Sequence, residues 1–235
     1  MFRTSIFFLI LGVSFFVPWL VLIVQPTIYL NSIEPIPYDP EDKTKGMYPP
    51  PVPNIAKQGH EVYNQQGCAF CHTQMVRPTY LGQDSYRTDW ISLDEEGNPT
   101  ATRMRESTPY DFIGESYAHL GVSRFGPDLS NVGTRRKDRA WHYTHLYNPR
   151  AIHSWSVMPG YRHLFETRVI QGQVSDDAVQ LPEKYAPPEG YEIVPTKEAK
   201  ALVGYLLTLK KDAPLPVELG GESPEEEGAA AAPAG

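Results

Sequence analysis

Two patterns of hydrophobicity divide the chain into a uniformly apolar N-terminal stretch and a longer amphipathic region. Residues 5–24 (SIFFLILGVSFFVPWLVLIV) contain no charged side chain. A helix of about 20 residues rises by about 30 Å, which matches the thickness of the bilayer hydrocarbon. Pro18 would interrupt a helix in water, but membrane helices tolerate proline with local adjustment. The pattern therefore predicts a single transmembrane anchor over residues 1–25.

A cleaved secretory signal is the main alternative for this stretch. The apolar core of such a signal is normally about 7–15 residues long and precedes a cleavage site of small residues. The run here is longer and QPTIYLNS, which follows it, contains no such site, so a retained anchor is favoured. Arg3 precedes the run, and the next basic residue after it is Lys43. The positive-inside rule then predicts a cytoplasmic N-terminus and places everything after Val24 outside. We therefore expect a single-pass protein of the inner (plasma) membrane with a periplasmic (extracytoplasmic) domain.

The sequence after the anchor is first rich in proline and then amphipathic. Residues 26–53 are dense in proline and show little apolar periodicity, which predicts an extended tether. Residues 54–212 carry apolar positions at helical spacing and predict a folded, mainly α-helical domain. Its first helix is expected to begin with Asn54 as N-cap, and its last to cover residues 196–211. Residues 213–235 are acidic and of low complexity, which is typical of a tail outside the domain.

Composition and charge narrow the class of function. The chain has 235 residues and a net charge of −7, whereas a nucleic-acid-binding domain normally carries a basic face. We therefore expect no nucleic-acid partner. Only two cysteines are present, too few for a disulfide scaffold or a four-cysteine zinc site.

Both cysteines lie in one motif, Cys68-Ala69-Phe70-Cys71-His72. The pattern C-x-x-C-H is typical of covalent haem c attachment. Two thiols three positions apart reach the two vinyl groups of haem as thioethers, and the adjacent imidazole binds the iron. A redox dithiol gives no role to the histidine, and a zinc site needs two further ligands at short spacing. The sequence therefore predicts one covalently bound haem c, with Cys68 and Cys71 on the porphyrin and His72 on the iron.

A sixth iron ligand is expected from a segment far from His72 in the sequence. Met158 is favoured because it precedes a proline in an aromatic-rich loop, and because His/Met ligation raises the reduction potential. Met75 is too close to His72 to cross the haem, and residues 94–106, which include Met104, are interpreted as a polar surface insertion. Bis-histidine ligation remains an alternative. Its candidates are His119, His142, His145, His153 and His163.

The segment Gly126-Pro127-Asp128-Leu129 follows the haem motif at a distance that lets the chain return beside His72. A ligating imidazole normally donates its second N–H to a carbonyl, and the Pro127 carbonyl is the predicted acceptor. Leu129 is predicted to pack on the haem. From these four residues alone, an ordinary turn is an equal alternative.

These motifs resemble, in order, the mono-haem subunit (subunit II) of cbb3-type cytochrome c oxidases. The resemblance rests on the single anchor and on four segments. The segments are CAFCHTQMVRP (68–78), GPDLSNVGTR (126–135), WHYTHLYNPR (141–150) and SVMPGY (156–161). The specific part is the continuation Gln74-Met75-x-Arg77-Pro78 and the spacing from NPR (148–150) to Met158, since C-x-x-C-H is generic to c-type cytochromes.

The resemblance implies a class I cytochrome c fold with loop insertions and with His72 and Met158 as axial ligands. It also implies an electron-transfer subunit that is no enzyme on its own. Its partners would be the large haem–copper subunit and the other cytochrome c subunits of the complex. Arg77 and Arg135 match motif positions of the family, and contact with the haem propionates or a neighbouring subunit is a hypothesis for both.

Two other functions fit the same layout of anchor and haem domain. One is the cytochrome c subunit of a nitric oxide reductase, and the other is a free-standing membrane-anchored electron carrier. Co-purifying copper favours the oxidase, whereas non-haem iron favours the reductase, and a free carrier purifies without a large haem subunit. A peroxidase-like enzyme would require an open position on the iron.

Overall fold

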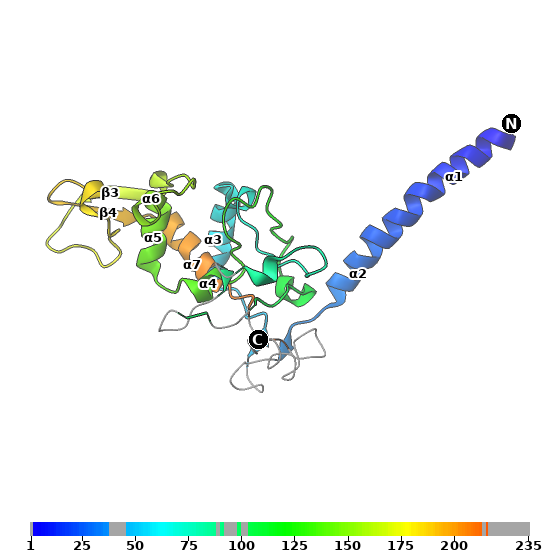
Figure 1. The fold of residues 1–235 in the computed structure, drawn as a ribbon, viewed down its shortest axis with the longest axis horizontal. Helices are drawn as coiled ribbons and strands as arrows, with labels where there is room; N and C mark the ends of the chain where they lie inside the picture. The colour runs from blue at the N-terminus through cyan, green and yellow to red at the C-terminus, as the bar shows by residue number, and fades with distance from the viewer. Residues whose placement is uncertain are drawn as a thin grey trace, which may run out of the picture. The chain divides into compact units, whose positions relative to one another are not determined.

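The computed structural model describes residues 2–37, 46–87, 90–91, 98–99, 103–212 and 215. Helices make up most of the regular structure of these residues (Figure 1). The chain divides into two compact units, the first being Met1–Pro51 with Thr108–Ser116 and the second Val52–Ser107 with Tyr117–Gly235. Of the predicted acidic tail at 213–235, all but Leu215 lies outside the described residues.

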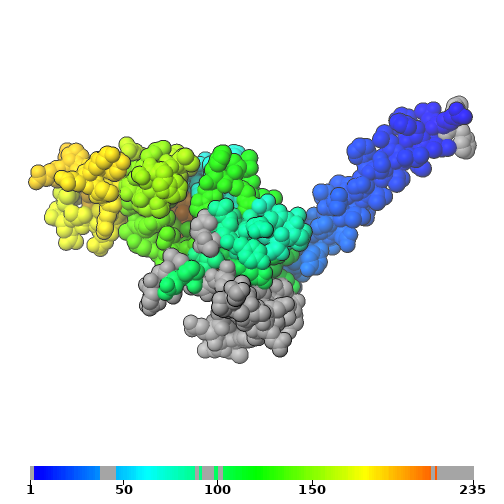
Figure 2. All heavy atoms as spheres, viewed as in Figure 1, coloured from blue at the N-terminus to red at the C-terminus, as the bar shows by residue number. Residues whose placement is uncertain are grey.

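The first unit begins with a continuous apolar helix. It consists of α1 (Phe2–Trp19), a π-helical turn (Leu20–Val24) and α2 (Gln25–Ser32). The stretch Arg3–Ser32 is long and apolar enough to cross a membrane, with a mean hydropathy of 2.7 over its best window, and that window is not buried (Figure 2). The helix passes the predicted boundary at residue 25. A π-helical turn ahead of Pro26 lets the helix continue past a residue that has no backbone N–H to donate.

The rest of the first unit is held by a short antiparallel pair and one buried polar contact. β1 (Ile36–Pro37) pairs with β2 (Met47–Tyr48). The Tyr48 hydroxyl donates a hydrogen bond to the Asp111 carboxylate, and both residues are buried. Asp111 belongs to the 3-10 turn Pro109–Phe112 and also accepts from the Thr108 amide at 2.6 Å. The segment predicted to be an extended tether therefore includes a helical start and an ordered end.

The second unit is built around α3 (Asn54–Gln65) and α7 (Lys197–Thr208), which make the most extensive helix–helix contact of the described chain. Thr196 caps α7 through its Oγ1, which accepts from the Ala199 amide at 3.3 Å. The predicted cap of α3 was wrong by one residue. Pro53 is the N-cap and its carbonyl accepts from the Lys57 amide at 3.1 Å, so Asn54 is already helical.

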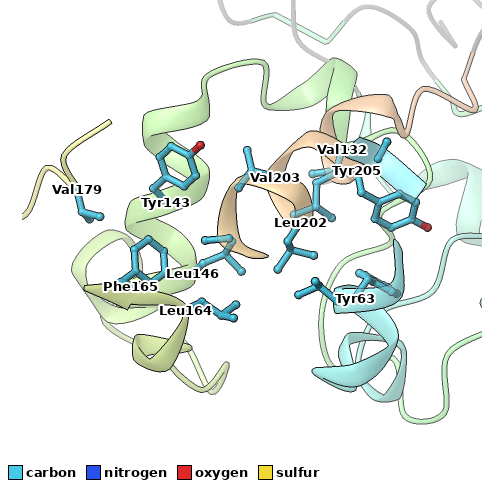
Figure 3. Close-up of a cluster of buried hydrophobic side chains, with 14 of the residues drawn as sticks. Tyr63, Val132, Tyr143, Leu146, Leu164, Phe165, Val179, Leu202, Val203 and Tyr205 are labelled. Atoms are coloured by element: carbon cyan, nitrogen blue, oxygen red, sulfur yellow. The ribbon is translucent and has the colours of Figure 1, made fainter. Parts of the chain in front are cut away.

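Close approach of α3 and α7 depends on a glycine. A Cβ atom at Gly59 would lie 2.0 Å from the Ala201 carbonyl oxygen, so only glycine fits at this crossing. Buried side chains of both helices then meet those of α5 (Arg139–Tyr147) in one hydrophobic core (Figure 3). Its labelled members are Tyr63, Val132, Tyr143, Leu146, Leu164, Phe165, Val179, Leu202, Val203 and Tyr205.

Shorter elements connect these helices. Asp138 caps α5, because its carboxylate accepts from the Ala140 and Trp141 amides at 2.9 and 3.2 Å. α5 is flanked by α4 (Val132–Arg135) and α6 (Pro149–Ile152). β3 (Phe165–Val169) and β4 (Tyr191–Pro195) pair antiparallel with Phe165 opposite Pro195. Among its described residues, this unit also contains 3-10 turns at Cys68–Phe70, Asp84–Tyr86, Arg162–Leu164 and Glu183–Tyr185.

A small second core corrects one sequence prediction. Met104 was expected on the surface, but it is buried together with Val76, Trp90 and Ile91. Its amide donates to the Ser85 carbonyl at 2.7 Å, which ties the end of the polar stretch to the domain. Because most of its neighbours are polar or charged, the sequence pattern did not indicate that Met104 packs inward. Residues 92–97 and 100–102 lie outside the described part of the chain.

The close helix crossing gives the first testable prediction. Gly59→Ala should lower the free energy of unfolding by about 1–3 kcal/mol, because the helices must separate to admit the methyl group. Gly204→Ala on α7 is the control, since its Cβ would lie 3.7 Å from Ile55 Cγ2, an ordinary contact. That control should be neutral or stabilise by up to about 1 kcal/mol. Urea unfolding measures both, and equal stability of the Gly59→Ala and wild-type proteins would contradict the prediction.

Candidate haem site

The two cysteines and the histidine of the motif share one turn after α3. Gly67 has a φ of 69°, a left-handed conformation that suits glycine, and it directs the chain away from the helix. The amides of Cys71 and His72 then both donate to the Cys68 carbonyl, at 3.1 and 3.0 Å. Both thiols are partly buried and form no disulfide. The local fold thus presents Cys68, Cys71 and His72 from a single turn.

The structure brings the segment 126–129 beside His72. The Nδ1 atom of His72 lies 2.8 Å from the Pro127 carbonyl oxygen, and the Gly126 amide donates to the Cys71 carbonyl at 2.9 Å. A Cβ at Gly126 would lie 2.1 Å from His72 Cε1, so glycine is needed for this approach. Since a carbonyl only accepts, Nδ1 carries the hydrogen and Nε2 is the nitrogen left for a metal. Burial lowers the pKa of His72, which favours the neutral imidazole that metals bind.

Asp128 fastens the same segment to the residues after His72. Its buried carboxylate accepts from the Thr73 and Ser130 hydroxyls, from the Met75 amide at 2.9 Å and from the Ser130 amide at 2.7 Å. The Leu129 amide donates to the Thr73 carbonyl at 2.8 Å. Sequence reasoning did not assign a role to Asp128. The signal was the pair Asp128 and Ser130, since an aspartate side chain commonly accepts from the backbone two residues on.

The methionine loop meets the motif through the hydrophobic core. Met158 and Leu129 both pack against this core, as do Cys68 and Ala69. The loop closes when the Tyr161 amide donates to the Leu146 carbonyl at 2.8 Å. Burial, followed by the neighbouring Cys68, raises the pKa of Tyr161 to about 12. The loop that carries Met158 therefore ends beside the first cysteine.

The two arginines that match motif positions have partners within the protein. Arg77 donates its Nε to Asp84 at 2.9 Å and its Nη2 at 3.0 Å, and Arg124 adds a contact at 2.7 Å. Arg135 donates its Nη2 to the backbone carbonyl of Asp128. Arg77 is thus part of a buried-carboxylate ion pair, whereas Arg135 supports the segment that reaches His72.

Most of the alternative iron ligands are engaged elsewhere in the second unit. The Nε2 atoms of His119 and His60 lie 2.9 Å apart, and His142 Nε2 is 2.8 Å from the Arg136 carbonyl oxygen. His163 Nε2 lies 2.7 Å from Gln66 Oε1. The rings of His145 and His153 lie close to each other, with centroids 6.4 Å apart.

The donor set fits a haem better than a bare metal ion. Among the described residues, no group of three or more His, Cys, Asp or Glu side chains is arranged to hold a metal. Burial raises the pKa of Cys68 to about 11, so its thiol stays protonated at neutral pH, unlike a zinc or redox thiolate. A neutral imidazole, a thioether and two thiols around one apolar core are the groups that a haem c requires.

The ion pair of Arg77 gives a pH prediction. Burial alone would raise the pKa of Asp84, but hydrogen bonds from Arg77 and Arg124 outweigh it and lower the pKa from 3.8 to about 2. Because the folded pKa lies below the unfolded one, this stabilisation is present above about pH 4 and is lost as the pH falls toward 2.

The wild-type protein should lose about 1–2 kcal/mol of stability through this pair as the pH falls from about 4 to 2, after allowance for solvent screening of Arg77. The Asp84→Asn protein should lack this pH-dependent loss, because it has no carboxylate at this position. Urea unfolding at a series of pH values measures the difference. Asp177→Asn is the control, since Asp177 forms an exposed pair with Lys200. Parallel pH profiles of the Asp84→Asn and wild-type proteins would contradict the prediction.

Comparison with known proteins gives one family match. The model of the family described as "Cytochrome C oxidase, mono-heme subunit/FixO" matches residues 106–198. None of the curated proteins compared with the chain matches it. The matched region contains the segment 126–129, α5 and the Met158 loop, and it begins after the cysteine motif. Over residues 106–198 the chain therefore matches the mono-haem subunit family of cytochrome c oxidases, FixO, which is the family its motifs resemble.

Proposed function

We propose that the chain is a membrane-anchored mono-haem c subunit that relays single electrons within a cbb3-type haem–copper oxidase. One observation carries the proposal. His72 directs Nδ1 to the Pro127 carbonyl, 2.8 Å away, in the same turn that presents both cysteines. This is the arrangement expected of a haem-ligating imidazole whose second nitrogen is held by a carbonyl. The family match to a mono-haem oxidase subunit supports the same conclusion independently.

Each site residue has a defined task in this proposal. Cys68 and Cys71 would form the thioethers to the haem, and the His72 Nε2 and the Met158 sulfur would bind its iron. The haem supplies reversible one-electron chemistry. The remaining residues would hold these groups in place. Asp128 fastens the segment that contains Pro127, and Leu129 would pack against the apolar face of the haem. No side chain here needs to act as an acid, base or nucleophile, so the subunit has no catalysis of its own.

Exposed apolar side chains support an electron-transfer role. Phe70, Val122, Phe125 and Val157 are each more than 60% exposed. Phe70 lies between the two cysteines, and its carbonyl accepts from the Ser123 amide at 3.0 Å, which brings Val122 into the same neighbourhood. Val157 precedes the methionine. These side chains are suited to exclude water where partner haem proteins approach, since apolar surface is favourably buried in an interface.

In this proposal the apolar helix anchors the protein in the membrane. With its N-terminus in the cytoplasm, the helix would place the haem domain in the periplasm, beside the other subunits of the oxidase. The charge pattern around the helix supports this orientation, because Arg3 precedes it and no basic residue follows until Lys43.

Haem staining tests the proposal directly. The chain is purified in detergent from a host that attaches haem c, denatured, and stained for haem on a gel. The wild-type chain should retain haem, whereas the Cys68→Ala/Cys71→Ala double variant should lose all of it, because no thioether can form. Absence of covalent haem from the wild-type chain would refute the proposal. Copper in the native complex supports the oxidase assignment, and non-haem iron in its place would indicate a nitric oxide reductase.

A second prediction concerns the sixth ligand. Met158→Ala should keep covalent haem but lose the sulfur-to-iron charge-transfer absorption of the ferric protein, because the iron loses its thioether. Its reduction potential should fall, since His/Met ligation raises it. Met47→Ala is the matched control, as Met47 is an exposed methionine of β2. An unchanged spectrum in Met158→Ala would show that another residue, such as a histidine, binds the iron.

A further inference from the structure

Arg124 has a backbone conformation that residues with a side chain disfavour. Its φ is 51°, and among the described residues it is the only residue other than glycine with a positive φ. The left-handed region is strained for a residue that carries a Cβ, and a bulky side chain there is uncommon. Such strain persists only where the surrounding structure enforces it, and it gathers at functional sites. The roles assigned above do not explain why Arg124 adopts this conformation.

The side chain of Arg124 is fixed at its far end. Its Nη2 atom donates to the Asp84 carboxylate at 2.7 Å, and its guanidinium lies over the ring of Trp90, 5.4 Å from the centroid. Asp84 and Trp90 are both buried. Asp84 is itself held in place, because it also accepts from the Nε and Nη2 atoms of Arg77. The guanidinium of Arg124 is therefore anchored to a buried carboxylate and a buried indole.

The backbone on both sides of Arg124 is bonded to the cysteine motif. Before it, the Ser123 amide and hydroxyl donate to the Phe70 carbonyl at 3.0 and 2.7 Å. After it, the Gly126 amide donates to the Cys71 carbonyl at 2.9 Å. The conformation of Arg124 thus sets the path of the chain between these two attachment points.

The same path leads to the acceptor of His72. Pro127, the residue after Gly126, places its carbonyl oxygen 2.8 Å from His72 Nδ1. The approach is close, since a Cβ at Gly126 would lie 2.1 Å from His72 Cε1. A change of φ at Arg124 would shift both residues relative to the imidazole, because they follow it directly in the chain. A hydrogen bond to the second nitrogen orients a ligating imidazole and raises its basicity.

We propose that Arg124 is a positioning residue for His72. Its contacts with Asp84 and Trp90 hold the strained turn that brings the Pro127 carbonyl to Nδ1. This inference rests on the proposed haem function. The hydrogen bond makes the imidazole a better electron donor to the iron that Nε2 would bind, which favours the ferric state. The anchored turn therefore lowers the reduction potential of the haem.

The test compares two substitutions of Arg124 in the full, haem-loaded chain. Arg124→Ala removes the anchor but keeps a Cβ, so the turn should relax and the bond from Nδ1 should weaken. We expect a higher reduction potential and several-fold faster solvent exchange of the His72 Nδ1 hydrogen, followed by NMR. Arg124→Gly should retain most of the wild-type behaviour, because glycine adopts this φ without strain and needs no anchor. Wild-type potential and exchange in the alanine variant overturn the inference, as does a glycine variant shifted as far as the alanine variant.

The sign of the change separates positioning from charge. Loss of a cation near a haem would by itself stabilise the ferric state and lower the potential, which is opposite to the rise expected here. Arg87→Ala is the matched control, since the Arg87 guanidinium lies over the same Trp90 ring, 4.7 Å from its centroid, but outside the turn. The potential of this control should not rise. A fall in the potential of Arg124→Ala, or an equal rise in the control, overturns the inference.

Two further outcomes are distinguishable. If Arg124→Ala does not fold, Arg124→Gly decides alone: wild-type potential and exchange support the inference, and a shift of either overturns it. Haem staining separates the inference from the proposed function. If the wild-type chain carries no covalent haem, the proposed function fails, whereas a haem protein whose potential and His72 exchange are insensitive to Arg124 refutes this inference alone.

Discussion

The close crossing of α3 and α7 is the constraint on which the second unit depends. The crossing places a carbonyl oxygen of one helix where any side chain at Gly59 would stand, 2.0 Å from its Cβ position. Gly59 lies in the middle of α3, which ends at Gln65, and the cysteine motif begins three residues later. The apolar core that forms between the helices then receives Met158 and Leu129 from two distant segments. Helix packing therefore places the groups that the proposed haem requires.

A second level of organisation is polar and local. His72 and the residues after it are tied to the segment 126–130 by the Pro127 carbonyl, by the Asp128 carboxylate and by backbone bonds on both sides. Because several donors converge on one buried carboxylate, the two segments hold their relative position tightly. Such rigidity suits the proposed electron carrier, whose ligands should move little between the two oxidation states.

The proposed haem ligands and attachment residues include no ion-paired side chain. The ionised groups with defined partners, such as Arg77 with Asp84 and Lys200 with Asp177, lie outside the donor set of the proposed haem site. Burial keeps the Cys68 thiol protonated and lowers the pKa of the His72 imidazole. An apolar setting would raise the cost of the ferric charge on the proposed haem and so favour its reduced state.

The sequence alone determined the features that depend on neighbouring residues. The apolar run of residues 5–24 predicts a helix, because periodicity and hydrophobicity act locally, and the same reasoning located α3 and α7 to within a few residues. The haem-attachment motif is also a local feature, since the spacing of Cys68, Cys71 and His72 can be recognised in the sequence without knowledge of the fold. The predicted acceptor of His72 followed from the same chemistry, and the distance to Pro127 agrees with it.

Only the tertiary structure decided which distant residues meet. Met104 lies in a polar stretch, yet it is buried because Val76, Trp90 and Ile91 surround it. Arg77 pairs with Asp84, and Asp128 became a fastening point because Thr73 and Met75 lie within its reach. Local chemistry predicts what a residue can do, whereas packing decides which partner it finds.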